Sequence, residues 1–127
     1  MPDLDPTRPH NPASDVPIYL ILMTEVFIAQ DLALTIKEHE PTAIVMIAIT
    51  AAQAVMMIDS HATLAVAFLC EQPTRFGSSE LARAIAARGG HVVLLGEEAE
   101  MIGPTNGWDV LERPFSTETV MAHLARN

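Results

Sequence analysis

Five short apolar runs recur along the chain, separated by longer segments of mixed polarity. The runs span residues 18–23, 43–49, 64–69, 91–95 and 108–111. Continuous apolar stretches of this length are typical of parallel strands covered on both faces, whereas strands with one solvated face alternate between apolar and polar residues. The pattern therefore predicts five buried strands.

The segments between the runs have the spacing of amphipathic helices. Ile28, Leu32 and Ile36, for example, recur on one face of a helix. We expect helix caps at Thr24, Thr50, Ser78 or Ser79, and Ser116, with stops at Pro41 and at Gly89 and Gly90. Residues 97–102 can form little more than one turn before Gly103 and Pro104, so the fourth predicted helix is short.

Strands that alternate with helices predict a parallel sheet with right-handed crossovers and helices on both faces. We therefore expect a flavodoxin-like (βα)5 three-layer sandwich, an α/β fold with the five-stranded order 2-1-3-4-5. A length of 127 residues suits one domain. Residues 1–16 are rich in proline and aspartate and poor in apolar side chains, so we predict a disordered tail there and a folded domain over residues 17–127.

Charge and composition exclude several function classes. The formal charge of −9 opposes binding to a phosphate backbone, so we expect no nucleic-acid partner. No apolar run is long enough to span a bilayer, and no secretory leader is evident, so we expect no membrane association. The single cysteine, Cys70, is compatible with a reducing cytoplasm.

The histidines do not suggest a metal site. His10, His39, His61, His91 and His123 are far apart in the sequence and lack the spacing of zinc ligands. We expect each of them to be an ordinary surface or loop residue. We also expect no cofactor.

Four segments resemble bacterial response-regulator receivers, and the resemblance extends over roughly residues 17 to 126. Residues 23–32, 50–54, 81–85 and 111–115 resemble the first loop and helix, the second loop, the third helix and the end of the fifth strand of that family. The sequence is most similar to alphaproteobacterial-type single-domain receivers, which have a weak fourth helix and a similar Pro-Phe motif. The resemblance implies a chemotaxis-receiver-like domain in a two-component system of bacterial signal transduction.

The resemblance also identifies the positions at which a working receiver carries its chemistry. An acidic pair after the first strand holds Mg²⁺, an aspartate after the third accepts phosphate, and a hydroxyl and a lysine after the fourth and fifth strands bind the phosphoryl group. In this sequence the acidic pair maps to Met23 and Thr24, the acceptor to Leu69, the hydroxyl to Gly96 and the lysine to Arg113.

None of these positions has the family's residue. Glu25 is the one carboxylate left beside the first strand, and Val110 replaces the usual aromatic switch. We therefore expect a degenerate pseudo-receiver that is neither phosphorylated nor an enzyme. We further expect Cys70 to be a small buried residue; the alternative is a cysteine that is modified or oxidised. We expect Arg113 to form ion pairs with Glu71, Glu25 and Glu97.

The short fourth helix directs attention to a candidate interface. It covers less of the sheet, so Met101, Ile102, Trp108 and Val110 are either partly exposed interface anchors or side chains that fold back as core plugs. The leading hypothesis is a protein-interaction or dimerisation module. The alternative is a small-ligand sensor that uses a pocket at the strand ends, and an enzyme ranks last because no catalytic set is present.

Overall fold

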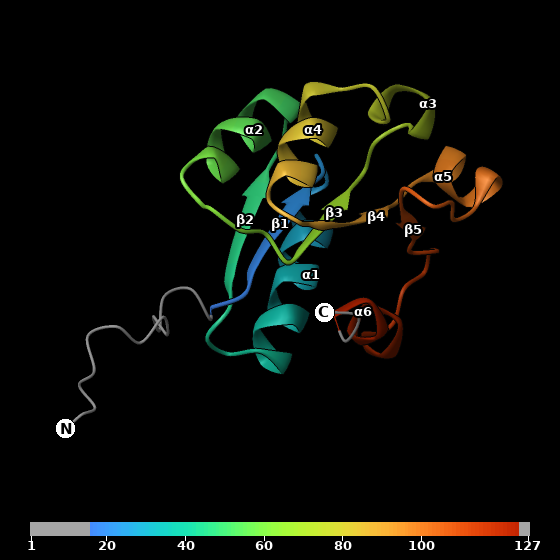
Figure 1. Cartoon of the computed structure of the whole chain (residues 1–127). Coiled ribbons are helices and arrows are strands. Elements are labelled where there is room, and N and C mark those ends of the chain that lie inside the picture. The colour runs from blue at the N-terminus through green and yellow to red at the C-terminus, as the bar shows by residue number, and fades with distance from the viewer. Residues whose placement is uncertain (1–15, 125–127) are drawn as a thin grey trace.

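The computed structural model describes residues 16–124 and contains one parallel sheet (Figure 1). In chain order the elements are β1 (Ile18–Leu22), α1 (Val26–His39), β2 (Ile44–Ala48), α2 (Ala51–Asp59), β3 (Val66–Leu69), α3 (Pro73–Phe76), α4 (Glu80–Ala87), β4 (His91–Leu94), α5 (Glu97–Ile102), β5 (Asp109–Val110) and α6 (Thr117–Leu124). The strand order is β2-β1-β3-β4-β5, which confirms the predicted flavodoxin-like fold.

One short helix, α3, was not predicted, so the short fourth helix of the sequence analysis is α5 in the structure. Its six residues confirm the expected shortening. Nearly all of the predicted disordered tail, residues 1–15, lies outside the described residues.

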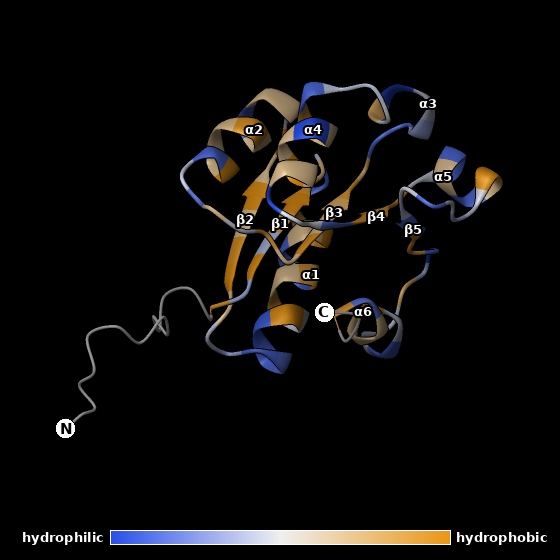
Figure 2. Ribbon diagram, in the orientation of Figure 1, coloured by the Kyte–Doolittle hydropathy of each residue, from blue (hydrophilic) through white to orange (hydrophobic). Residues whose placement is uncertain are grey.

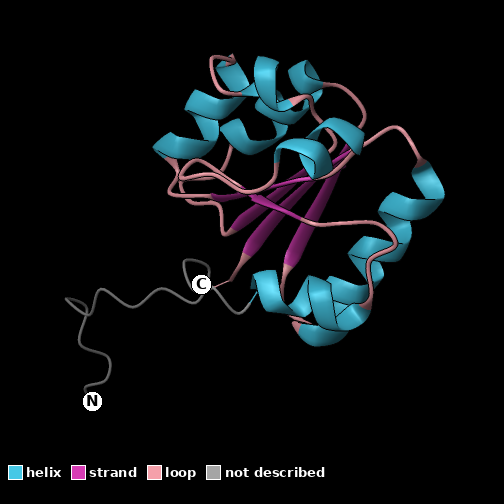
Figure 3. Cartoon of the chain, turned by 90° about the vertical axis from the view of Figure 1, so that its right-hand side faces the viewer, coloured by secondary structure: helices cyan, strands magenta, loops and turns pink. Residues whose placement is uncertain are grey.

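The sheet separates two apolar layers. Along β1, Ile18, Leu20 and Leu22 belong to one core cluster, and Tyr19 and Ile21 belong to the other. Buried residues of α2, α3, α4 and α5 complete the first cluster, and buried residues of α1 and α6 complete the second. Figure 3 shows these two groups of helices on opposite sides of the strands. Because both faces of the central strands are covered, their sequences are continuously apolar.

The prediction of five buried strands is wrong at the two edges of the sheet. β1 and β3 are buried at every position. β2 and β5 are edge strands, and each has a neighbouring strand on one side within the described sheet. Ile44 of β2 is accordingly 42% exposed, and both residues of β5 are half-buried.

Three of the predicted helix caps are confirmed. The hydroxyls of Thr50, Ser79 and Ser116 each accept a hydrogen bond from a backbone N–H of the first helical turn, at 3.1, 3.1 and 3.2 Å. The predicted cap at Thr24 is wrong, because Glu25 occupies the N-cap of α1 and its side chain makes no capping bond.

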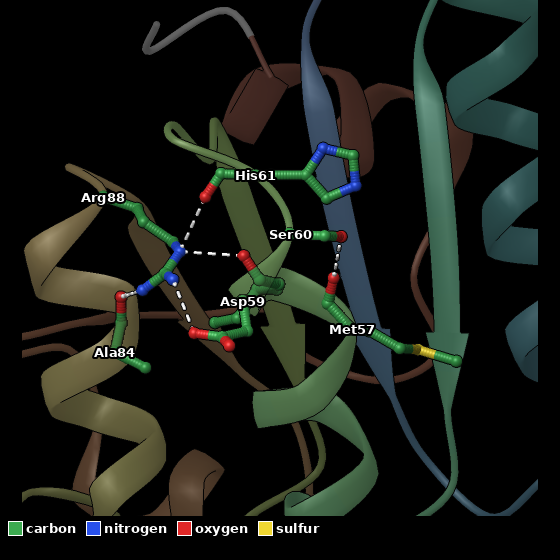
Figure 4. Close-up of polar contacts among 7 residues, drawn as sticks. Met57, Asp59, Ser60, His61, Ala84 and Arg88 are labelled. Atoms are coloured by element: carbon green, nitrogen blue, oxygen red, sulfur yellow. Dashed lines mark hydrogen bonds and ion pairs between the residues drawn. The ribbon is translucent and has the colours of Figure 1, made fainter.

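A single arginine joins the ends of α2 and α4 (Figure 4). Arg88 Nε donates to the carbonyls of Ile58 and His61 at 2.8 and 2.9 Å, and Nη1 donates to the carbonyl of Ala84 at 2.9 Å. Nη2 lies 3.3 Å from a carboxylate oxygen of Asp59. The guanidinium thus links the C-terminal end of α4 to the end of α2 and to the residues that follow α2, through three backbone carbonyls.

Candidate functional site at the strand ends

The carboxyl ends of the strands place the acceptor position inside the core. Leu69, the last residue of β3, is fully buried and belongs to the core cluster beneath α2, α4 and α5. Met23 is also buried, with 4% of its surface exposed. Thr24 and Glu25 are exposed. The position to which the resemblance assigns the phosphoacceptor is therefore part of the apolar core.

A pocket of about 330 Å³ lies at these strand ends. Four of the mapped positions line it, namely Met23, Glu25, Gly96 and Arg113, whereas Leu69 and Thr24 do not. The sequence analysis did not include its other lining residues, among them Asp31 and Phe115. Asp31 is exposed on α1 and resembles an ordinary solvent-facing position in the helical pattern, so no signal marked it.

Arg113 pairs with Glu100 of α5 and not with the expected glutamates. Its Nε donates to Glu100 Oε2 at 2.8 Å, its Nη2 donates to Oε1 at 3.3 Å, and its backbone N–H donates to Oε2 at 3.0 Å. These bonds lower the pKa of the Glu100 carboxyl and raise the pKa of the Arg113 guanidinium. Ion pairs of Arg113 with the predicted partners Glu71, Glu25 and Glu97 are not found among the described residues, because Glu100, the fourth residue of α5, faces Arg113. The charge of Glu97 contributes only to the raised pKa of Arg113.

Cys70 is exposed, which contradicts the expectation of a buried residue. The pKa of its thiol is nevertheless raised, chiefly by partial desolvation and secondly by the charge of Glu25, while Arg113 acts in the opposite direction. A raised pKa lowers the fraction of thiolate at neutral pH. The direction of this shift makes the thiol less nucleophilic than an unperturbed cysteine.

The four candidate interface residues divide into two pairs. Met101 and Ile102, at the end of α5, are 84% and 48% exposed. Trp108 and Val110 are half-buried and pack against the core, with the Trp108 ring edge-on to Phe76 at a centroid distance of 6.3 Å. Figure 2 shows the apolar end of α5 next to polar neighbouring ribbon. Each of the two alternatives therefore holds for one pair: Met101 and Ile102 are exposed, as expected of interface anchors, whereas Trp108 and Val110 pack against the core.

The sequence analysis missed further exposed apolar side chains. Phe27 at the start of α1 is 86% exposed, and Met56 of α2 is 77% exposed. Ile28, expected on the buried face of α1, is 38% exposed, because Ala29 lies on that face beside Leu32 instead. When apolar residues cover a wide face of a helix, their spacing in the sequence does not show which of them are exposed to solvent.

Two histidines and an aspartate meet at the amino ends of β4 and β5. His91 Nε2 lies 2.9 Å from Asp109 Oδ2, and His123 Nδ1 of α6 lies 3.8 Å from the same oxygen. Their side chains are 23%, 15% and 24% exposed for His91, His123 and Asp109. The expectation that all histidines are separate surface or loop residues is therefore wrong for His91 and His123. A signal existed, since the predicted order places β4 beside β5 and each of these two apolar runs contains one polar residue, His91 or Asp109.

Comparisons with known proteins bear on the fold. No protein-family model and no curated protein sequence matches the chain. Among solved structures, SdrG from Sphingomonas melonis Fr1 is 25% identical, with a TM-score of 0.65 over 87% of this chain and 94% of that one.

Two further structures have lower sequence identity. The response regulator receiver protein from Sinorhizobium medicae is 17% identical, with a TM-score of 0.62 over 89% of this chain and 94% of that one. The receiver domain of a modulated diguanylate cyclase from Desulfovibrio desulfuricans is 16% identical, with a TM-score of 0.64 over 88% and 93% of the two chains. The chain therefore has the fold of response-regulator receiver domains.

Within residues 16–124, none of the helices has the length and apolar character that crossing a membrane requires.

Proposed function

We propose that this protein is a cytoplasmic pseudo-receiver that acts in bacterial signal transduction by binding a protein, either a second copy of itself or a signalling partner. In this proposal it works without phosphorylation and without enzymatic turnover. The observation that carries the proposal is Leu69, which occupies the acceptor position and is fully buried in the core.

The surroundings of Leu69 support the loss of phosphoryl chemistry. Mg²⁺ prefers several oxygen ligands in a near-octahedral arrangement, and the positions of the acidic pair are Met23 and Thr24. Arg113, at the lysine position, forms a two-pronged ion pair with Glu100. Its charge is therefore balanced before any phosphoryl group arrives.

The exposed end of α5 supports the binding role. Met101 and Ile102 are apolar, adjacent and largely exposed, and residues of this kind anchor many protein interfaces. The Glu100–Arg113 pair joins the same helix to the segment after β5. Met101 and Ile102 thus follow directly after Glu100, whose ion pair with Arg113 fixes the position of α5.

Exposure of the protein to Mg²⁺ and acetyl phosphate tests the loss of chemistry. We expect intact-mass analysis to show no phosphorylated species, and beryllofluoride with Mg²⁺ to leave the amide NMR signals around the strand-end pocket unchanged. An active receiver treated in parallel is the positive control. An acid-stable or acid-labile phosphoryl adduct on a folded chain would overturn the proposal.

Sedimentation velocity and binding assays on two matched variants test the interface. Met101→Lys adds a charge to the exposed end of α5, and Met56→Lys adds the same charge to α2, where Met56 is 77% exposed. We expect the first variant to weaken self-association or partner binding at least tenfold and the second to leave it unchanged. Equal effects of the two substitutions would remove α5 from the interface.

A small-ligand sensor is the second candidate, and the strand-end pocket favours it. Its volume of about 330 Å³ lies at the lower end of the range for small-molecule sites, and its lining combines apolar side chains with the charged groups of Glu25, Asp31 and Arg113. A metabolite at 100 times its Kd would stabilise the folded state by about 2.7 kcal/mol. A thermal-shift screen of small carboxylates and phosphates would detect such a rise, and a screen without any rise would argue against this candidate.

A further inference from the structure

A cluster of three metal-ligand side chains lies outside the strand-end pocket. His91, Asp109 and His123 come from β4, β5 and α6, and one ligand atom of each lies within 4.8 Å of the other two. His91 and Asp109 are the first residues of neighbouring parallel strands, but β5 starts further along the sheet, so Asp109 is paired with Val93 and not with His91. None of the three residues lines the strand-end pocket.

The spacing of the ligand atoms is close to what a tetrahedral ion requires. Zinc bonds to histidine nitrogen and carboxylate oxygen are about 2.1 Å long, so two ligands of one tetrahedral ion lie about 3.4 Å apart. The two distances from Asp109 Oδ2, 2.9 Å to His91 and 3.8 Å to His123, lie on either side of that value. Small rotations of the two imidazoles would equalise them.

Neighbouring residues restrain the three ligand side chains but leave them partly accessible to solvent. The rings of His123 and Phe68 are nearly perpendicular, at 85° and with centroids 6.5 Å apart, and Phe68 is fully buried. His91 is held in β4 by the backbone pairing of Val66 with His91. Because the three ligand side chains remain between 15% and 24% exposed, solvent can supply a fourth ligand.

The donor set indicates which ions would bind. Two imidazoles and one carboxylate suit zinc and related divalent transition metals, whereas Mg²⁺ and Ca²⁺ prefer sets made of oxygen alone. Three protein ligands with a fourth position open to water are a common zinc arrangement.

We propose that His91, Asp109 and His123 form a binding site for a divalent transition metal of the zinc class, which joins the C-terminal helix α6 to the amino ends of β4 and β5. The site binds one ion per chain and is independent of the proposed interaction role of α5. Its ligands come from three elements that only the folded chain brings together, so ion binding stabilises the native state.

Zinc titration of the full-length protein against a competing chromogenic chelator tests the site. We expect one Zn²⁺ per chain and a rise in melting temperature that Mg²⁺ does not produce. Bound Co²⁺ should show the intense visible absorption of tetrahedral coordination. Circular dichroism would confirm that each variant below is folded.

Three ligand variants, His91→Gln, His123→Gln and Asp109→Asn, should each weaken Zn²⁺ binding at least tenfold and abolish the tetrahedral Co²⁺ spectrum. His39→Gln, at an exposed position of α1, and His10→Gln should retain both. Unchanged zinc affinity in any two folded ligand variants, or loss of affinity in either control, would overturn the proposal. Absence of zinc binding to the unmodified chain would overturn it directly and leave a purely structural ion-pair cluster.

Discussion

The carboxyl and amino ends of the central strands differ in how their polar side chains are paired. At the carboxyl ends, Met23 and Leu69 are buried and apolar, and the Arg113–Glu100 ion pair is partly exposed. At the amino ends, polar side chains form specific bonds, among them His91 with Asp109. The receiver fold is thus compatible with apolar side chains at the positions of Met23 and Leu69, because both pack in the core.

The amino ends also contain bonds that secure the helices. Arg88 connects the last turns of α2 and α4, and Tyr19 of β1 donates a hydrogen bond to Glu40 at the end of α1. The polar groups at this end are thus matched to one another. The effects of substitutions on the free energy of unfolding should therefore differ between the two ends, both in magnitude and in their dependence on pH.

The largest expected effect comes from restoring the acceptor carboxylate. Leu69→Asp places an unpaired charge in a fully buried position and should lower the free energy of unfolding by about 3 to 5 kcal/mol. It should not restore phosphorylation, because Met23 and Thr24 provide no carboxylates for Mg²⁺. Urea denaturation measures the first expectation and intact-mass analysis after acetyl phosphate the second.

Leu69→Met is the matched control, since it roughly conserves volume and should cost less than about 1.5 kcal/mol. If the aspartate variant were as stable as the methionine variant, the carboxyl end would be more open to water than the structure shows.

At the amino end, removal of the Arg88 side chain should have the next largest effect. Arg88→Ala removes the donors to the carbonyls of Ile58, His61 and Ala84 and should lower the free energy of unfolding by about 2 kcal/mol. Asp59→Ala removes only the exposed partner, 80% accessible, and should change stability by less than about 0.5 kcal/mol. Similar losses in both variants would mean that the ion pair, and not the capping of the carbonyls, is what matters.

Tyr19, at the amino end of β1, should make the stability of the folded state depend on pH in the alkaline range. Burial, followed by the hydrogen bond and charge of Glu40, raises the pKa of the Tyr19 hydroxyl well above its usual value. The native state therefore keeps this proton after the unfolded state has lost it. The stabilisation is complete below about pH 10, the ordinary tyrosine pKa, and is lost as the pH rises further.

Tyr19→Phe should accordingly cost about 1 kcal/mol at pH 7 and a smaller amount at pH 11. Chemical denaturation of both proteins at the two pH values makes the comparison. A difference that stays constant between pH 7 and pH 11 would contradict the assigned ionisation.

The smallest effect is expected at Glu100, in the exposed ion pair near the carboxyl ends. The pKa of Glu100 is lowered by bonds to Arg113, so its stabilisation is present above the ordinary glutamate pKa and is lost as acidification protonates the carboxyl. Glu100→Gln should barely change the melting temperature at pH 7, and an NMR titration of the unmodified protein should show a pKa of Glu100 below the ordinary glutamate value. An ordinary glutamate pKa at Glu100 would contradict the pairing with Arg113.

Much of the fold was predictable from local patterns. Continuous apolar runs predicted the strands, and the hydroxyls of Thr50, Ser79 and Ser116 marked helix starts within one residue. These features depend on neighbouring residues in the sequence. The cap at Thr24 failed because Glu25 is the residue with extended backbone at the start of α1.

The site was predictable only as a set of positions. The resemblance assigned Leu69 and Arg113 to the strand ends, but the partner of Arg113 depends on how α5 is turned toward the segment after β5. Likewise, spacing in the sequence gave no reason to group His91 with His123, because 31 intervening residues separate them and only the packing of α6 against the sheet brings them together.

By itself, the sequence determined the α/β alternation and the parallel order of the strands, since these follow from residue types and their local periodicity. The tertiary structure decided which apolar groups are exposed, which glutamate pairs with Arg113, and that His91, Asp109 and His123 meet. Those outcomes depend on side-chain contacts between elements distant in the sequence, and local patterns carry no information on such contacts.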